Sequence, residues 1–245
     1  MIPYHVRGND KESMKRLGIF VFYDEKGIVD EYVEYLLSSL LQEIQELVIV
    51  INGNILPDGY KKLQRYSSLL YCRENSGFDG AAYRDVILNY YKDKDWENWD
   101  ELILLNDTFY GPFFPWKIIF DEMEKERADF WGLSRHPQGE FTDGEKFQSH
   151  IQSYFLAVRK SLFLSKAWGE FWKELGPANT LLEAVQNFEI KFSNFFEKKD
   201  FCSKSWQELQ GMRLNNQYNQ NPCFSYAYEL VKYHKFPIIK KKLFN

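Results

Sequence analysis

A run of apolar residues that ends in two polar ones constrains the fold of this chain more than any other stretch. Leu102–Leu105 leads directly into Asn106 and Asp107, and a turn ending at Gly111 follows. Unbroken apolar runs of this length are typical of strands that are buried on both faces. A carboxylate at the end of such a strand is costly to desolvate unless it binds a cation or a hydrogen-bond donor.

Strand and helix signals alternate along the first half of the chain. Apolar runs of strand length precede segments whose apolar residues recur at helical spacing. We expect strands over 17–23, 47–51, 68–72 and 102–105. We expect helices over 29–45, 57–66 and 115–126, and a further helix that follows residue 82 and ends near residue 91. This alternation with short loops predicts an α/β fold with a Rossmann-type, mostly parallel central sheet flanked by helices.

The second half and the two ends follow a different pattern. We expect short strands over 129–134 and 151–159, a polar loop over 135–148, helices over 161–175 and 180–198, and a helical piece near 227–233. The chain then divides into a polar N-terminal arm (1–16), one domain (17–214) and a C-terminal helical appendage (215–245).

Polar residues follow the ends of the predicted strands. Asp24, Asn52, the segment 73–79, and Asn106 with Asp107 each come directly after an apolar run. Because the carboxyl ends of parallel strands share one edge of a sheet, these groups should meet there. That edge is where a nucleotide is expected to bind.

The segment Arg73–Ala82 has features of a phosphate site. Its glycines, Gly77 among them, let a ligand approach the backbone at a strand-to-helix turn, and helix N–H groups attract anions. Arg73 can bind phosphate in bidentate fashion, with Asn75 and Asp79 in the same turn. The alternative is a tight turn in which Asp79 caps the following helix.

Asp107 is a candidate ligand for a divalent cation. Mg²⁺ or Mn²⁺ commonly bridges a protein carboxylate to substrate phosphates. The alternative is that Asp107 caps the next turn, since Thr108 and Gly111 favour turns.

Glu189 is a candidate general base. It shares one face of the helix predicted over 180–198 with the apolar residues Leu182, Val185, Phe192 and Phe196. A carboxylate in an apolar stripe should have a raised pKa, which suits a base. The alternative is a position at the edge of the stripe, paired with Lys191 or Lys198.

Other polar and aromatic residues allow two interpretations each. Gln152, Ser153 and Tyr154 could contact sugar hydroxyls and Trp131 could stack on a sugar, or they are ordinary strand and core positions. His136 and His150 are interpreted as surface residues. The lysines 240–242 could touch an anionic membrane surface, or form a solvated helix end.

Composition excludes several classes of protein. A formal net charge of −4 gives no general attraction to nucleic acid. Three cysteines without metal-ligand spacing favour a reducing compartment. The polar N-terminus lacks the apolar core of a signal peptide, and no apolar run is long enough to span a bilayer. We expect a cytoplasmic protein, with peripheral contact to the inner face of the membrane.

Five of these segments, in this order, resemble the rhamnan-synthesis protein F family. They are 19–23, 73–79, 104–112, 129–133 and 152–155. That family resembles GT-A-type glycosyltransferases of bacterial cell-surface polysaccharide synthesis. The resemblance covers about residues 15–245. It implies a GT-A-like fold with a nucleotide-binding half over 17–128 and a sugar and acceptor half over 129–214.

The resemblance also implies an activity, namely transfer of rhamnose from a dTDP-linked donor to a polysaccharide or lipid-linked acceptor. It implies contacts with other polysaccharide-synthesis enzymes as well. The metal-binding D-x-D of the GT-A pattern corresponds to Asn106-Asp107-Thr108, where Asp107 matches. Glu189 takes the place of the carboxylate base of inverting enzymes. The expected nucleotide-sugar contacts are Tyr23, Asp24, Asn52, Arg73, Asn75, Gly77, Asp79, Asn106 and Gln152.

Two other classes compete with this interpretation. The incomplete D-x-D favours a non-catalytic module that binds a nucleotide sugar or a partner protein on a degenerate GT-A fold. A glycoside hydrolase with Asp107 and Glu189 as its carboxylate pair is the third, although the nucleotide-type first half argues against it.

Overall fold

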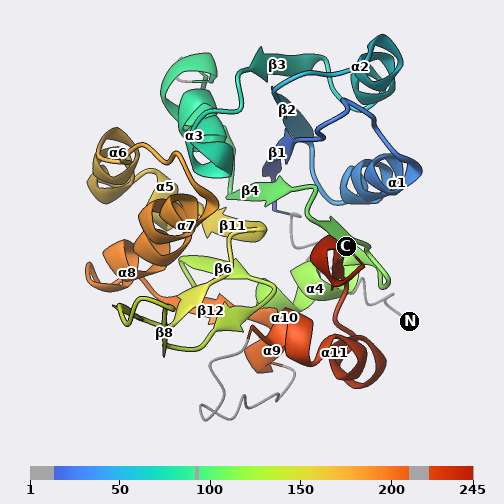
Figure 1. The fold of residues 1–245 in the computed structure, drawn as a ribbon. Helices are drawn as coiled ribbons and strands as arrows, with labels where there is room; N and C mark the ends of the chain where they lie inside the picture. Colours follow the sequence, from blue (N-terminus) through green and yellow to red (C-terminus); the bar gives the residue numbers. More distant parts are fainter. Residues whose placement is uncertain (1–13, 92–93, 210–220, 245) are drawn as a thin grey trace, which may run out of the picture.

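The computed structural model describes residues 14–91, 94–209 and 221–244, and a seven-stranded sheet runs through its centre (Figure 1). The strand order is β12-β6-β11-β4-β1-β2-β3. The strands are β1 (Arg16–Phe22), β2 (Glu46–Asn52), β3 (Leu69–Arg73), β4 (Glu101–Asn106), β6 (Phe130–Gly132), β11 (Phe155–Arg159) and β12 (Ser203–Ser205). Of these, β11 runs antiparallel to both its neighbours, β4 and β6. The other pairings are parallel, so the sheet is mixed and mostly parallel.

Helices cover both faces of the sheet (Figure 1). One face packs against α1 (Glu31–Leu40), α2 (Pro57–Gln64), α4 (Trp116–Met123) and α11 (Ala227–His234). The other packs against α3 (Phe78–Asp85), α5 (Lys160–Phe163), α6 (Lys166–Lys173) and α8 (Lys191–Glu197). The remaining helices are α7 (Leu181–Ala184), α9 (Trp206–Leu209) and α10 (Pro222–Ser225). Two π-helices, Val86–Tyr90 and Val185–Ile190, extend α3 and α7, and two 3₁₀ turns cover Trp96–Asn98 and Lys241–Leu243.

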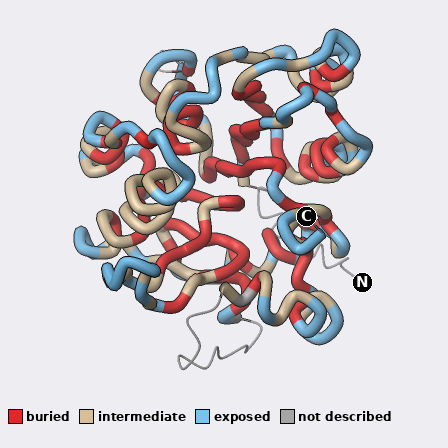
Figure 2. Tube along the Cα trace, in the orientation of Figure 1, coloured by how far each residue is buried: buried red, intermediate tan, exposed pale blue. Residues whose placement is uncertain are grey.

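The apolar runs of the sequence form the centre of two cores. Along β1, Phe20 and Phe22 face one core while Ile19 and Val21 face the other, and all four are buried. The strands are buried along the middle of the molecule, with exposed segments at the periphery (Figure 2). A strand that is covered on both faces needs apolar residues at every position, which is why the runs are unbroken.

Three expectations about the second half are wrong in detail. The segment 135–148 is not an irregular loop, since it contains β7 (Arg135–His136), β8 (Gly139–Glu140) and β9 (Lys146–Phe147). The strand expected over 151–159 is interrupted, because β10 (His150–Ile151) pairs with β7 and β11 begins at Phe155. The helix expected over 161–175 breaks at Ser165, whose hydroxyl accepts from the amide of Trp168 and caps α6.

The end of the chain is anchored in the main domain. Strand β13 (Ile239–Lys240) pairs with β5 (Phe109–Tyr110), directly after β4. Phe236 and Ile238 are buried in the same core as β1 and α4. The C-terminus therefore lies beside the carboxyl edge of the sheet (Figure 1). The N-terminal arm up to residue 13, and residues 215–220 of the expected appendage, lie outside the described residues.

Replacing Gly111 with alanine should loosen this anchor. A Cβ at Gly111 would lie 2.5 Å from the carbonyl oxygen of Pro237, and the φ of +145° disfavours any side chain. We expect Gly111→Ala to lower the free energy of unfolding by about 2 kcal/mol, measured by urea denaturation. Gly169→Ala is the control, because its Cβ meets no atom within 4 Å on helix α6. Equal effects of the two changes would contradict the anchor.

Candidate functional site

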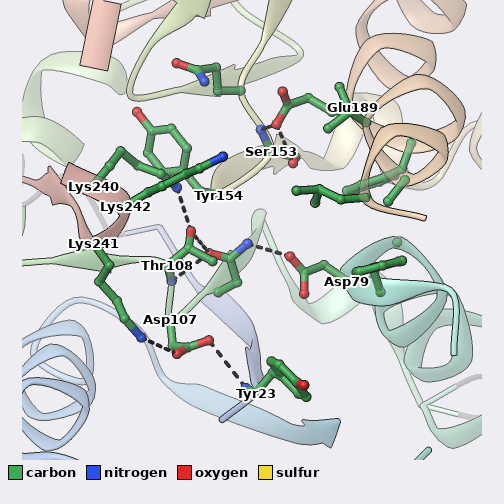
Figure 3. Close-up of a pocket in the computed structure, with 18 of the residues that line it drawn as sticks. Tyr23, Asp79, Asp107, Thr108, Ser153, Tyr154, Glu189, Lys240, Lys241 and Lys242 are labelled. Carbon is green, nitrogen blue, oxygen red and sulfur yellow. Dashed lines mark hydrogen bonds and ion pairs between the residues drawn. The ribbon is translucent and has the colours of Figure 1, made fainter. Parts of the chain in front are cut away.

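A cavity of about 440 Å³ lies at the carboxyl edge of the sheet. We call it the sheet-edge pocket. Its walls include Tyr23 after β1, the start of α3, the loop after β4, the segment 152–154, the π-helix 185–190 and the C-terminal lysines 240–242. Figure 3 shows the lysines on one side, and Asp79 and Glu189 on the other. Groups far apart in sequence therefore meet at one edge, as the strand-end pattern predicts.

Asn106 joins the end of β4 to the start of α3. Its Nδ2 donates to Oδ2 of Asp79 at 2.6 Å, and its Oδ1 accepts from the hydroxyl of Thr108 at 2.6 Å. Burial raises the pKa of Asp79 to about 6, and nearby Asp107 adds to this, while the Asn106 amide opposes it. Asp79 is in the first turn of α3, whose N-cap is Gly77, so it is not the cap itself.

Asp107 is 4% exposed, and protein groups occupy both of its oxygens. Oδ1 accepts from the amide of Tyr23 at 3.4 Å. Oδ2 accepts from the hydroxyl of Tyr32 at 3.0 Å and lies 3.1 Å from Nζ of Lys241. Burial raises the pKa of Asp107, and the Lys241 ammonium is the largest opposing influence. The cation that this buried carboxylate requires is thus supplied by the chain.

The residues at this edge do not fit a divalent cation. Mg²⁺ and Mn²⁺ prefer several oxygen ligands, and an ammonium already lies against Asp107. Within 14–91, 94–209 and 221–244, no group of three His, Cys, Asp or Glu residues could hold a metal. Asp79, the other carboxylate near β4, is bonded to the Asn106 amide. The donor set around Asp107 suits a lysine.

Glu189 lies on the π-helix, across the pocket from the lysines (Figure 3). Its Oε2 accepts from the amide and the hydroxyl of Ser153, both at 2.7 Å, and its Oε1 lies 3.3 Å from Nε2 of His150. Burial acts to raise the pKa of Glu189, but His150 and Ser153 outweigh it and hold the pKa at about 2. The predicted raised pKa is wrong, because these three donors stabilise the charged form.

Of the two histidines near the pocket, His150 is buried and His136 is half-buried, so neither is the exposed residue that was expected. His150 is 2% exposed, and His136 stacks on it with ring centroids 5.3 Å apart. Nδ1 of His150 lies 2.9 Å from the carbonyl oxygen of Gln148, so a protonated His150 donates from both ring nitrogens. Burial lowers the pKa of His136, and the neighbouring His150 acts in the same direction.

Four expected nucleotide contacts lie outside the pocket lining. The guanidinium of Arg73 donates to Asp85, to Asn52 and to the carbonyl of Ser76, so it braces the turn after β3 and is not directed at phosphate. Asp24 accepts from the amides of Lys26 and Ile28 and closes its own turn. Asn52 is committed to Arg73, and Gly77 has the positive φ of 76° that this N-cap needs.

Five expected nucleotide contacts do line the pocket: Tyr23, Asn75, Asp79, Asn106 and Gln152. The amide oxygen of Gln152 accepts from the hydroxyl of Ser134 at 2.8 Å. Trp131, considered for sugar stacking, is fully buried, and its Nε1 donates to Glu101 at 2.7 Å.

The lysines at the C-terminus are the site residues that sequence reasoning missed. Lys240, Lys241 and Lys242 all line the pocket, although Lys241 and Lys242 begin a 3₁₀ turn and Lys242 is exposed. Burial lowers the pKa of Lys240, and the nearby carboxylates do not offset that effect. No local signal predicts this placement, because it depends on the pairing of β13 with β5.

The low pKa of Glu189 predicts a pH-dependent contribution to stability. A carboxylate whose pKa falls from its usual 4.5 to about 2 on folding stabilises the fold above about pH 4.5, and this is lost as the pH falls through 2. We expect Glu189→Gln to cost about 3 kcal/mol at pH 7 and progressively less below pH 4.5, in urea denaturation at several pH values. A difference that stays constant with pH would contradict the assignment.

The fold and site define a class: an α/β domain with a pocket lined by lysines and carboxylates at the carboxyl edge of a mixed sheet. The family model for rhamnan synthesis protein F matches residues 47–245. The chain therefore belongs to the rhamnan synthesis protein F family. The predicted α/β class, with a mostly parallel central sheet flanked by helices, is confirmed.

The chain is also similar to curated bacterial proteins. It is 26% identical to an uncharacterized protein, y4gN, of Sinorhizobium fredii over 188 residues. This match covers 76% of this chain and 46% of that protein. It is 28% identical over 134 residues to virulence protein VirA of Vibrio anguillarum, which is 54% of this chain and 40% of that protein. The chain thus spans less than half the length of these relatives.

Among solved structures, a 4-diphosphocytidyl-2C-methyl-D-erythritol synthase of Anaerococcus prevotii matches with a TM-score of 0.47, at 12% identity over 78% of this chain and 86% of that one. A putative nucleotide-diphospho-sugar transferase of Desulfovibrio desulfuricans gives a TM-score of 0.40, at 16% identity, and the match covers 91% of this chain and 96% of that one. The Mn/GDP form of core-mannan synthase A of Aspergillus fumigatus gives a TM-score of 0.42, at 9% identity, and the match covers 81% of this chain and 73% of that one.

Proposed function

We propose that the chain is a glycosyltransferase that moves a sugar from a nucleotide-diphosphate donor to a glycan acceptor. The observation that carries the proposal is the sheet-edge pocket, which combines basic groups with a carboxylate across from them. Basic groups suit a diphosphate leaving group, and a carboxylate suits the proton of an acceptor hydroxyl. Ligands of open α/β sheets bind at this edge.

The donor in this proposal is dTDP-rhamnose, and the acceptor is a cell-surface polysaccharide or a lipid-linked glycan. Membership of the rhamnan synthesis protein F family supports the choice of sugar. The nucleotide lies against Tyr23 and Asn75, next to the start of α3, and the sugar extends toward Gln152 and Ser153. No helix within the described residues is long and apolar enough to cross a membrane. We place the reaction at the cytoplasmic face of the membrane, where a lipid-linked acceptor and other enzymes of polysaccharide synthesis would meet the chain.

The reaction in this proposal is a single displacement with inversion. The acceptor oxygen forms a bond to the anomeric carbon, the bond from that carbon to the diphosphate oxygen breaks, and the acceptor proton passes to Glu189. Glu189 is in the ionised form that a base needs, but a pKa near 2 makes it a weak base. Acceptor binding must therefore replace a hydrogen bond from Ser153, which would raise the basicity of Glu189.

A screen of nucleotide sugars and bare nucleotides by thermal shift tests the donor. A ligand at about one hundred times its Kd adds about 2.7 kcal/mol to the free energy of unfolding. For a chain of this size we expect dTDP-rhamnose to raise Tm by about 5–10 °C. If no nucleotide sugar or nucleotide changes Tm, the proposal is wrong.

Substitution of Glu189 tests the base. We expect Glu189→Gln to bind the donor with unchanged affinity and to lower kcat by about 10²–10⁴-fold, because a positioned base contributes about this much. Release of free dTDP in the presence of acceptor measures kcat. The matched control is Glu183→Gln, on α7 outside the pocket lining. A wild-type kcat in Glu189→Gln would make Glu189 structural.

A non-catalytic module that binds a nucleotide sugar or a partner protein is the second candidate. The observation that favours it is the engagement of Asp107 by Lys241, in the place where the GT-A pattern holds a metal. Donor binding without release of free nucleotide, over a panel of acceptors, would support the module.

A further inference from the structure

We infer that the consecutive lysines 240–242 form the diphosphate-binding site and replace the divalent cation of the GT-A pattern. The inference rests on the proposed function, since it names how the donor is held. It concerns a segment far in sequence from the strand ends where a nucleotide site is expected.

Lys240 lies at the centre of the pocket wall. Its Nζ donates to the hydroxyl of Thr108 at 2.6 Å and lies 4.3 Å from the ring centroid of Tyr154. Both partners are neutral, so the ammonium charge has no compensating carboxylate within 4.0 Å among the described residues. Lys240 is thus positioned next to the end of β4 with its charge available to an anion (Figure 3).

Lys241 takes the place of the metal itself. Its Nζ lies 3.1 Å from Oδ2 of Asp107 and also donates to the hydroxyl of Tyr32. In the GT-A pattern this aspartate would bridge a cation to the donor phosphates. The ammonium is already bound on the aspartate, so the positive charge beside the diphosphate is a permanent part of the fold.

Lys242 supplies a free ammonium. It lines the pocket, its side chain is exposed, and it has no hydrogen bond or ion pair within the described part of the chain. Figure 3 shows it extending into the pocket above Thr108. A flexible lysine of this kind suits the outer oxygens of a diphosphate as a point charge.

The charges of the pocket favour a bound dianion. Asp107 is paired with Lys241, and Glu189 is paired with His150. Asp79, with its pKa near 6, is mostly ionised at pH 7 and is bonded to the Asn106 amide. Lys240 and Lys242 have no salt-bridge partner among the described residues, and the oxygens of a diphosphate would supply one.

Strand pairing determines the backbone position of these lysines. The backbone of β13 pairs Lys240 with Phe109, and the amide of Lys241 donates to the carbonyl of Thr108 at 3.1 Å. The buried Ile238 fixes the strand from the other end. A preorganised cation needs no recruitment from solution and favours charge on the leaving diphosphate.

The test is isothermal titration of the full chain with nucleoside diphosphates, in EDTA and in Mn²⁺. The panel contains dTDP, UDP, GDP, CDP and ADP, and the tightest ligand is carried forward. We expect its Kd to agree within about twofold in the two buffers, and inorganic pyrophosphate to compete with it. We expect Lys240→Met and Lys242→Met each to raise Kd by about tenfold or more, since a hydrogen bond to a charged group contributes that much.

Four further variants, with circular dichroism as the check that each variant folds, make the result decisive. Lys240→Arg should restore most of the affinity, and Lys61→Met on exposed α2 should leave it unchanged. Asp107→Asn removes the carboxylate that a metal mechanism requires, so we expect its Kd to be the same in EDTA and in Mn²⁺. Lys242→Ala repeats the test at an exposed position. The inference can therefore still be tested if circular dichroism shows that Lys240→Met is unfolded.

A Kd that Mn²⁺ lowers by more than about twofold, in the wild-type chain or in Asp107→Asn, would overturn the inference and leave the proposed function standing. Normal affinity in both folded lysine variants, or failure of pyrophosphate to compete, would overturn it in the same way. If no nucleoside diphosphate binds with or without Mn²⁺, the proposed function fails, and this inference fails with it.

Discussion

The ion pair between Asp107 and Lys241 is the interaction on which the pocket depends. A carboxylate buried at the end of β4 is costly to desolvate unless it is paired, and the pairing brings in a residue 134 positions later in the chain. Since Lys241 is adjacent to β13, satisfying Asp107 also places Lys240 and Lys242 in the pocket. One electrostatic requirement thus joins the sheet edge to the C-terminus.

The pocket holds two carboxylates whose surroundings shift their pKa values in opposite directions. Asp79 is buried near Asp107 and has one hydrogen-bond donor, the Asn106 amide, so burial dominates and its pKa rises to about 6. Glu189 is equally removed from bulk solvent, but His150 and Ser153 donate to it and its pKa falls to about 2. Hydrogen-bond donors, and not burial alone, decide the charge state, which is why a helical stripe is a poor guide to pKa.

The order of strands and helices in the first half was predictable because it depends on local periodicity and on apolar runs. The same patterns indicated that Asp107, Asn106 and Asp79 gather at one edge, and the pocket contains all three. Arg73 was assigned to phosphate on its chemistry, yet Asp85 and Asn52 are closer partners that no local pattern reveals. The histidines were placed at the surface because a sequence does not show that β10 packs against the π-helix and α8.

The sequence by itself determined the α/β class, the family resemblance and the edge of the sheet at which chemistry is expected, because periodicity, strand ends and motif order are local properties. Tertiary structure decided which groups hold charge at that edge. The lysines 240–242, the partners of Glu189 and the bracing role of Arg73 all depend on contacts between segments that are distant in the chain. A buried charged or polar group is costly unless it has a hydrogen-bond or ion-pair partner. Only the folded arrangement determines which partner lies within hydrogen-bond distance of it.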